Sequence, residues 1–143
     1  MQQDIYSAPE SKLDSPKDGS CQVALWNPDV AGAWSLLFSP IFGSILVHKN
    51  WVSLGEEERA SKAKIWIYVS ILMAVISAFI GLFGLIYIVV WYFSSQKKQT
   101  LYLKENYSGD YPKKGWLKPI GIALVLLIGL IIILTAVFSS LIS

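Results

Sequence analysis

The apolar positions of this chain fall into three runs without a charged side chain. The longest run is Ile65–Phe93, and the last is Pro119–Ser143. A first run, Val30–Val47, is shorter and is interrupted by Pro40 and two glycines. Runs of this kind are typical of membrane-spanning helices, because about 20 apolar residues cross the hydrocarbon core of a bilayer.

The pattern predicts an all-α integral membrane protein, a small bundle of three hydrophobic helical segments at about residues 30–47, 65–93 and 119–142. The first segment is predicted to be kinked at Pro40 or re-entrant, because proline removes a helix hydrogen bond and so short a run barely crosses a bilayer. The second segment would be about 43 Å long as one helix. That length exceeds the roughly 30 Å hydrocarbon core and implies tilt.

The composition agrees with the membrane class. Of the 143 residues, 54% are apolar and 15% are charged, and the net charge of +2 gives no indication of nucleic-acid binding. Residues 1–25 are rich in Ser, Asp, Lys, Gln and Pro, and we expect them to form a disordered cytoplasmic tail. Residues 26–143 are predicted to form one membrane-embedded domain. The tail lacks the apolar core of a cleavable signal peptide.

The lysine and arginine counts predict the orientation. The tail has two of these residues, residues 48–64 have four and residues 94–118 have six. Three spanning segments would place eight basic residues on one side and four on the other, whereas a re-entrant first segment would give six on each side. The positive-inside rule therefore favours three spans, with the N-terminus in the cytoplasm and the C-terminus outside.

No set of residues points to catalysis, a cofactor or a metal. The three consecutive glutamates at 56–58 would point about 100° apart on a helix, so they do not converge on one ion. Glu58 precedes Lys62 by four residues, which is the favourable order for an ion pair on a helix. His48 and Cys21 are the only histidine and cysteine, and neither has a partner that completes a site. We therefore expect a protein that is not an enzyme.

Small residues recur along the second segment with alternating spacings of four and three. This spacing places them on one side of a helix, where a second helix can approach closely. The alternative is that small residues are simply common in membrane helices. The predicted helix-packing seam consists of Ser70, Ala74, Ser77, Gly81 and Gly84.

Lysines and tryptophans gather near the ends of the apolar runs. Each cation near an anionic leaflet contributes on the order of 1 kcal/mol, and amphipathic rings prefer the headgroup region. The basic loop predicted to face lipid or a partner contains Lys97, Lys98, Lys104, Lys113, Lys114 and Lys118. The predicted interface anchors are Trp26, Trp51, Trp66, Trp91 and Trp116. The alternative reading of the lysines is ordinary positive-inside bias.

Two blocks of sequence resemble a group of small bacterial inner-membrane proteins. The first block combines Leu25-Trp26-Asn27-Pro28 with WSLLFSPIFG from Trp34 to Gly43, Asn50-Trp51 and Leu54-Gly55-Glu56. The second block is YPKKGWLKP, from Tyr111 to Pro119, just before the last apolar run. The resemblance covers most of Leu25–Pro119. It implies a bacterial source and a shared fold, and it assigns no functional residue.

These features favour a non-enzymatic, multi-pass protein of the bacterial cytoplasmic (inner) membrane. It would act through its helix faces and basic loop on a membrane protein or on a second copy of itself, with membrane lipid as a further partner. The alternative is an immunity protein that protects against a membrane-targeting toxin, and a third possibility is an accessory subunit of a transporter or pore. The absence of Asp, Glu, Lys, Arg and His within the apolar runs weighs against active transport.

Overall fold

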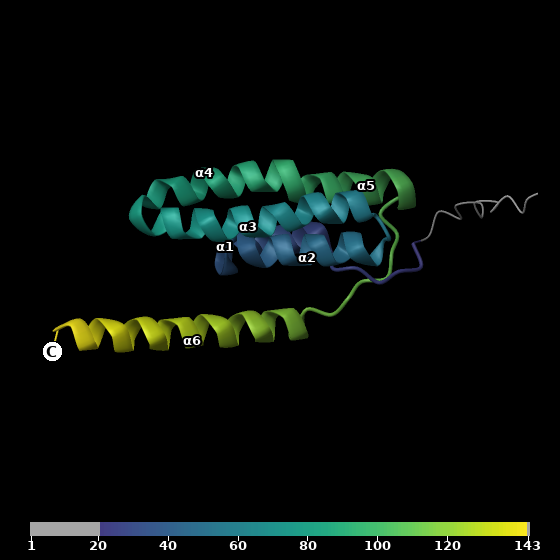
Figure 1. Cartoon of the computed structure of the whole chain (residues 1–143). Coiled ribbons are helices and arrows are strands. Elements are labelled where there is room, and N and C mark those ends of the chain that lie inside the picture. Colours follow the sequence, from purple (N-terminus) through teal and green to yellow (C-terminus); the bar gives the residue numbers. More distant parts are fainter. Residues whose placement is uncertain (1–20, 143) are drawn as a thin grey trace, which may run out of the picture.

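The described part of the chain, residues 21–142, is built from helices. In the computed structural model (Figure 1), no β-strand forms among these residues, so the predicted all-α class is confirmed. The helices α3 and α6 are the two described helices that are long and apolar enough to cross a membrane. The elements are α1 (Pro28–Phe38), α2 (Pro40–Ser53), α3 (Glu57–Phe79), α4 (Gly81–Trp91), the π-helical turn η1 (Tyr92–Gln96), α5 (Lys97–Tyr107) and α6 (Leu117–Ile142).

The first apolar run forms a helical hairpin. Helix α1 is capped by Asn27, whose side chain accepts a hydrogen bond of 3.0 Å from the first turn. The chain then turns at Ser39, whose φ of 95° lies outside the α-helical range. Helix α2 runs back beside α1. As a result, the Trp26 amide just before α1 donates a hydrogen bond to Asn50 near the end of α2. Of the two alternatives predicted for this run, the structure has a hairpin and not a kinked continuous helix.

The second apolar run is also a hairpin, so the prediction of one continuous helix over Ile65–Phe93 is wrong. Between α3 and α4, Ile80 leaves the helical conformation with φ −131° and ψ 81°. Helix α4 then runs back along α3 (Figure 1), and the Tyr87 hydroxyl lies 2.8 Å from that of Ser70. The turn is followed at once by Gly81, a poor helix former. Folding back also brings the buried hydroxyls of Ser70 and Tyr87 together, so that each has a hydrogen-bond partner.

The polar stretch after the second run is mostly helical, and the prediction of a loop over residues 94–118 is wrong. The turn η1 continues α4 directly into α5. Helix α5 ends at Ser108 and Gly109, both of which have a positive φ that stops the helix. Only residues 108–116 connect α5 to α6.

The last residues of the predicted tail, 21–25, pack against the segment before α6. The Leu25 amide donates to the Pro112 carbonyl, and the Leu25 carbonyl accepts from the Lys114 amide, both at 2.8 Å. Leu25 is completely buried, because it enters a small apolar cluster beside α5. The predicted disorder is therefore wrong for residues 21–25, and residues 1–20 lie outside the described residues.

Helix α6 stands apart from the other helices. None of its residues is buried, and Figure 1 shows it running alongside the bundle at a distance. A groove of about 340 Å³ lies between α2 and α6, with apolar walls apart from Ser39 and Lys49. The three predicted segments therefore form two packed hairpins and one separate helix.

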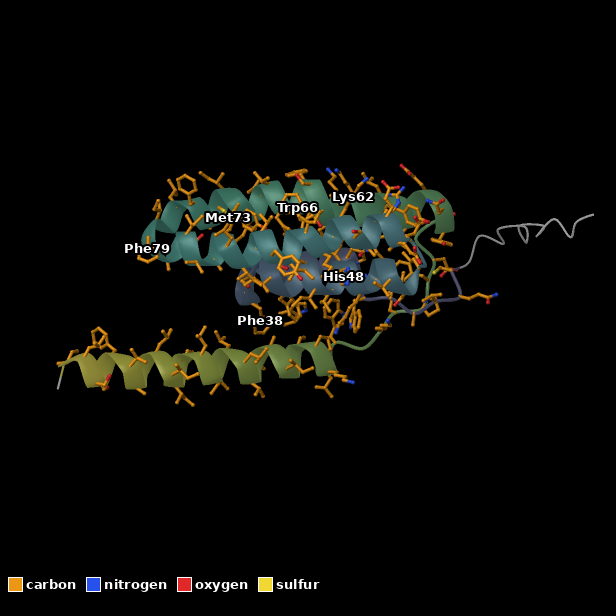
Figure 2. All side chains as sticks on the ribbon, viewed as in Figure 1. Phe38, His48, Lys62, Trp66, Met73 and Phe79 are labelled. Carbon is orange, nitrogen blue, oxygen red and sulfur yellow. The ribbon has the colours of Figure 1, made fainter. Side chains whose placement is uncertain are left out.

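Among residues 21–142, charge is confined to one end of the helices. Both hairpin turns, at Ser39 and Ile80, point away from the charged end, and the α3–α4 turn reaches farther, to the side where α6 ends (Figure 1). Figure 2 shows Phe38 and Phe79 toward these turns and Lys62 toward the charged end. No charged residue occurs in the α3–α4 turn, or in α6 beyond its second residue. The described residues therefore divide into a polar end and an apolar end.

The hairpin between α3 and α4 can be tested with a disulfide. A β-carbon built on Gly84 would lie 3.3 Å from that of Ser77, close to the roughly 3.5–4.5 Å that disulfides require. On a continuous helix, positions seven residues apart are separated by about 10 Å along the axis. We expect Ser77→Cys combined with Gly84→Cys, in a Cys21→Ser background, to form an intramolecular disulfide. Mass spectrometry after oxidation and thiol alkylation measures its yield.

The matched control for this test is Ala74→Cys combined with Gly81→Cys. These positions have the same seven-residue spacing, but Ala74 is exposed and a β-carbon at Gly81 has nothing within 4 Å. We expect no intramolecular disulfide from the control pair. Equal behaviour of the two pairs would contradict the hairpin.

Candidate functional site

Two amide side chains, Asn50 of α2 and Gln99 of α5, form the polar centre of the bundle. Both are completely buried. Asn50 Nδ2 donates to Gln99 Oε1 at 2.9 Å and to the Trp26 carbonyl at 2.8 Å. Gln99 Nε2 in turn donates to the Val47 carbonyl at 3.0 Å. This pair, which we call the amide junction, connects α2, α5 and the segment before α1.

A third buried amide, Gln96, lies where η1 meets α1. Its Nε2 donates to the Pro28 carbonyl, and a β-carbon on Gly32 would overlap its amide group. Trp91 is also completely buried, and its ring occupies the space that Gly43 leaves open on α2. Two buried atoms in this region, Trp91 Nε1 and Gln96 Oε1, have no hydrogen-bond partner among the described residues. The glycines that interrupt the first apolar run are thus positions where the second hairpin approaches closely.

A chain of three hydroxyl groups connects α2, α3 and α4 within the apolar part of the bundle. Ser70 Oγ lies 3.1 Å from Ser44 Oγ and 2.8 Å from the Tyr87 hydroxyl, and all three residues are buried. A buried hydrogen bond of this kind contributes about 1 kcal/mol net. These hydroxyls therefore join the two hairpins through Ser44 and Ser70, and the two arms of the second hairpin through Ser70 and Tyr87.

The five residues of the predicted packing seam are divided between two antiparallel helices. Ser70 and Ser77 of α3 lie at the contact with α4, where Gly84 faces Ser77. Ala74 and Gly81 are exposed. The structure thus places three of the five at the contact between α3 and α4, where Ser77 and Gly84 face each other and Ser70 contacts Tyr87. They do not form a continuous stripe along a single helix, because that helix is broken at the turn.

Two of the predicted interface anchors are inside the bundle. Trp51 is 4% exposed and Trp91 is 0% exposed, and the Trp51 ring packs edge-on against a tyrosine ring of α5, with centroids 4.9 Å apart. A buried ring cannot lie among lipid headgroups, so the prediction is wrong for these two residues. The remaining anchors are partly exposed, and their role stays a prediction: Trp26, Trp66 and Trp116.

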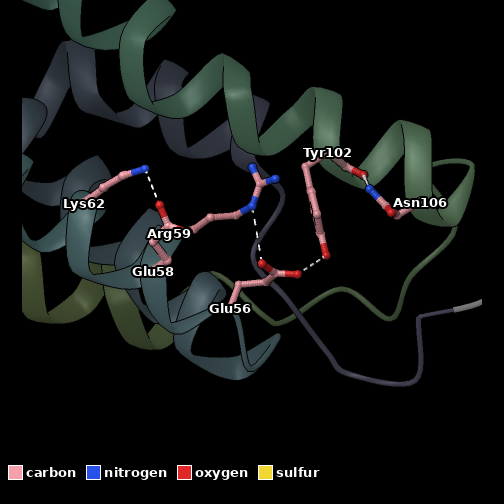
Figure 3. A network of polar contacts seen from close by, with 6 residues as sticks. All are labelled: Glu56, Glu58, Arg59, Lys62, Tyr102 and Asn106. Carbon is pink, nitrogen blue, oxygen red and sulfur yellow. Dashed lines mark hydrogen bonds and ion pairs between the residues drawn. The ribbon is translucent and has the colours of Figure 1, made fainter. Parts of the chain in front are cut away.

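At the charged end, a polar network joins α3 to α5 (Figure 3). Tyr102 donates a hydrogen bond to one carboxylate oxygen of Glu56, and Arg59 Nε lies 3.3 Å from the other. The Arg59 guanidinium also lies over the Tyr102 ring, 4.6 Å from its centroid. Burial, and then the nearby Glu56 carboxylate, raise the pKa of the Tyr102 phenol. The phenol is therefore a stable donor to Glu56 at neutral pH.

The other candidates for chemistry are occupied in structural contacts. Glu58 forms the predicted ion pair with Lys62, at 2.6 Å, and the hydrogen bond and charge of Lys62 lower the pKa of the Glu58 carboxyl. His48 Nδ1 lies 2.9 Å from the Ala60 carbonyl, so the histidine joins α2 to α3. Among residues 21–142, no group of three His, Cys, Asp or Glu side chains could hold a metal ion.

Beside the network, residues of α2, α3, η1 and α5 line a groove of about 570 Å³. We call it the cation groove, because Arg59, Lys62 and Lys98 line it, together with Glu58. Trp51 of α2, apolar side chains of α3, the Trp66 ring and serines of η1 line the rest. The sequence alone could not reveal this groove, since Lys98 meets the cations of α3 only because the second run folds back.

The six lysines of the predicted basic loop are distributed over three elements. Two of them contact aromatic faces: Lys97 Nζ lies 4.8 Å from the Phe93 ring centroid, and Lys114 Nζ lies 4.4 Å from that of Trp26. The set therefore belongs to the charged end of the molecule and not to one loop. Lys97, Lys98 and Lys104 lie on α5, Lys113 and Lys114 precede α6, and Lys118 lies on α6.

The two sequence blocks that carry the resemblance contact each other. Leu25 hydrogen-bonds to the backbone on both sides of Lys113, and Trp26 Nε1 donates to the Gly115 carbonyl at 3.2 Å. In comparisons with known proteins, the chain matches no family, no curated protein and no solved structure. A function for this chain therefore has to be argued from its own geometry.

Removing the Gln99 amide tests the amide junction. The substitution Gln99→Ala leaves the buried Asn50 amide with one partner fewer, and an unsatisfied buried polar group costs about 1–3 kcal/mol. We expect a lower free energy of unfolding, measured by denaturation in a mild detergent. The control Glu105→Ala changes an exposed residue of the same helix and should alter this free energy by less than about 0.5 kcal/mol. A similar loss in both variants would remove the amide junction as a special contact.

Proposed function

We propose that the chain is a non-enzymatic protein of the bacterial cytoplasmic (inner) membrane that acts by binding. Its charged end lies at the cytoplasmic surface, both hairpins enter the bilayer from that side, and α6 crosses it. Its partners are membrane lipid and either a membrane protein or a second copy of the chain. The observation that carries the proposal is the confinement of charge to one end of the described residues, with both hairpin turns at the other.

The lengths of the apolar arms support entry of the hairpins from one side. The uncharged part of α3, residues 65–79, extends about 22 Å, which is less than the roughly 30 Å hydrocarbon core. Helix α3 reaches the length of a span only when its charged first turns, residues 57–64, are included. By contrast, the 26 residues of α6 extend about 39 Å and can cross the whole core.

The distribution of lysine and arginine supports the orientation. The structure describes ten of the 12 basic residues in the chain, all except Lys12 and Lys17. The ten described residues lie toward the charged end. Three continuous spans would have placed the four basic residues of residues 48–64 on the outside. The two hairpins bring those four to the same side as the others, which agrees better with the positive-inside rule.

The roles of the buried polar groups favour binding over chemistry. The amide junction and the three-hydroxyl chain make hydrogen bonds between helices, so these groups support the fold. Helix α6 has no buried residue, and its surface is open to lipid or to another helix. A surface of this kind spreads its binding free energy over many contacts.

Cysteine labelling with a membrane-impermeant maleimide tests the orientation. In a Cys21→Ser background, we expect Glu57→Cys and Asp110→Cys to react only from the cytoplasmic side, because both residues are exposed at the charged end. Ile80→Cys should resist labelling from either side, since the proposal places this turn inside the bilayer. Inverted vesicles and intact spheroplasts provide the two directions. Reaction of Glu57→Cys and Asp110→Cys from opposite sides would contradict the hairpins' entry from one side.

Photo-crosslinking from α6 tests the binding function. A photoreactive phenylalanine analogue at Ile128 or Ile132, which are exposed and do not line the groove with α2, should form an adduct with a second protein chain in native membranes. The same analogue at Ala123, which lines that groove and is only partly exposed, is the control and should not. The adducts are resolved by electrophoresis and identified by mass spectrometry. Adducts with lipid alone from every position would exclude binding through α6.

A further inference from the structure

We propose that the cation groove binds the headgroup of an anionic phospholipid, with the phosphate held among Arg59, Lys62 and Lys98. The inference rests on the membrane placement proposed above, and it adds a ligand and a site to it. The groove volume of about 570 Å³ lies within the range of roughly 300–1,000 Å³ that small-molecule sites occupy.

The charges that line the groove favour an anion. Three basic side chains face one carboxylate, Glu58, which is already paired with Lys62. Arg59 is held in place by Glu56 and by the aromatic faces against its guanidinium, so little freedom is lost when it binds a ligand. Lys98 is exposed and has no hydrogen-bond or ion-pair partner among the described residues. Its three donors are therefore open to phosphate oxygens.

On α3, the lining residues follow the order of chemical groups in a phospholipid. Arg59 and Lys62 come first, and the apolar Ile65 and Val69 follow in the next turns toward the apolar end. A phosphate held at the cations would place an acyl chain along the apolar residues. Ile65 is 60% exposed, so this part of the groove has open apolar surface that a chain can cover.

The opposite wall also has its cation toward the charged end. Lys98 lies nearest the charged end, and Ser94 and Ser95 of η1 follow toward the apolar end. Serine hydroxyls at this level can donate to the ester oxygens of a glycerolipid. Both walls therefore lose their charges at the level where the uncharged run begins on α3 and ends at Phe93, and beyond it α3 presents apolar side chains and η1 presents serines.

The groove fits a lipid better than an acidic segment of a protein. An acidic peptide could also pair with the cations, but it would leave the apolar part of the groove uncovered. A phospholipid covers both halves, because one molecule carries the anion and the chain in the required order. In the proposed membrane placement, the groove also lies at the headgroup level, where such lipids are already concentrated.

Native mass spectrometry of the purified full chain in a neutral detergent tests the proposal. Phosphatidylglycerol is titrated into wild type, Lys98→Ala and Lys104→Ala. We expect Lys98→Ala to weaken phosphatidylglycerol binding about fivefold, the effect of one lysine near an anionic headgroup. Lys104→Ala removes the same charge from the same helix, outside the groove, and should bind as wild type does. Equal weakening in both variants, or none in Lys98→Ala, would overturn the proposal.

Three further arms identify the ligand. Phosphatidylcholine should bind at least fivefold more weakly than phosphatidylglycerol, because its net charge is zero. Inorganic phosphate should compete weakly, since it cannot use the apolar half. Competition by phosphate at the lipid's own concentration would show a free-anion site and overturn the lipid assignment. Tighter competition by a synthetic acidic peptide than by phosphatidylglycerol would also overturn it.

The membrane placement is measured separately, by resistance of the chain to carbonate extraction from native membranes. A chain that resists extraction while Lys98→Ala binds lipid as wild type does would contradict the groove site alone. A chain that carbonate releases would contradict the proposed function. Because Lys98 is exposed, Lys98→Ala should leave the fold intact. The control measurement is the free energy of unfolding in detergent, which we expect to be unchanged.

Discussion

The arrangement of the two hairpins depends on the amide junction. Apolar contacts are non-directional, so two apolar hairpins can slide along each other at little cost. The buried amides of Asn50 and Gln99 have partners at one position only, and a buried amide without a partner costs about 1–3 kcal/mol. The hydrogen bonds to Trp26 and Val47 extend this constraint to the start of α1 and the last part of α2. The junction thus fixes the register between hairpins that hydrophobic packing holds together.

The same junction determines what the surface of α5 presents. Neighbouring residues on a helix point about 100° apart. Because Gln99 is turned toward α2, Lys98 is turned toward α3, where it lines the cation groove opposite Arg59. The proposed lipid site is therefore a consequence of the buried contact one residue away. Its cations come from segments that are distant in the sequence, and the register of the bundle brings them together.

The sequence predicted the apolar runs and the Glu58–Lys62 pair, because each of these depends on residues close together in the chain. It did not predict the turn at Ile80. A run without charges indicates that a segment has apolar surroundings, but it does not indicate whether the helix continues or turns back. Gly81 fits the spacing of the predicted seam in either case. The excess length of the run, roughly 43 Å against 30 Å, was interpreted as tilt. The groove could not be predicted either, since it exists only when α3 and α5 lie side by side.

The tryptophans and the first run show a second limit of sequence patterns. Trp66 and Trp91 both lie near an end of the same apolar run, yet Trp66 is partly exposed and Trp91 is completely buried. What separates them is Gly43 of the first run, which leaves room for the Trp91 ring. The serines at 35 and 44 of that run are also completely buried, and their hydroxyls bond to Ala31 and to Ser70. The small and polar residues that interrupt the first run therefore mark positions that contact other helices of the chain and not lipid. The first hairpin thus depends on the second for its stability.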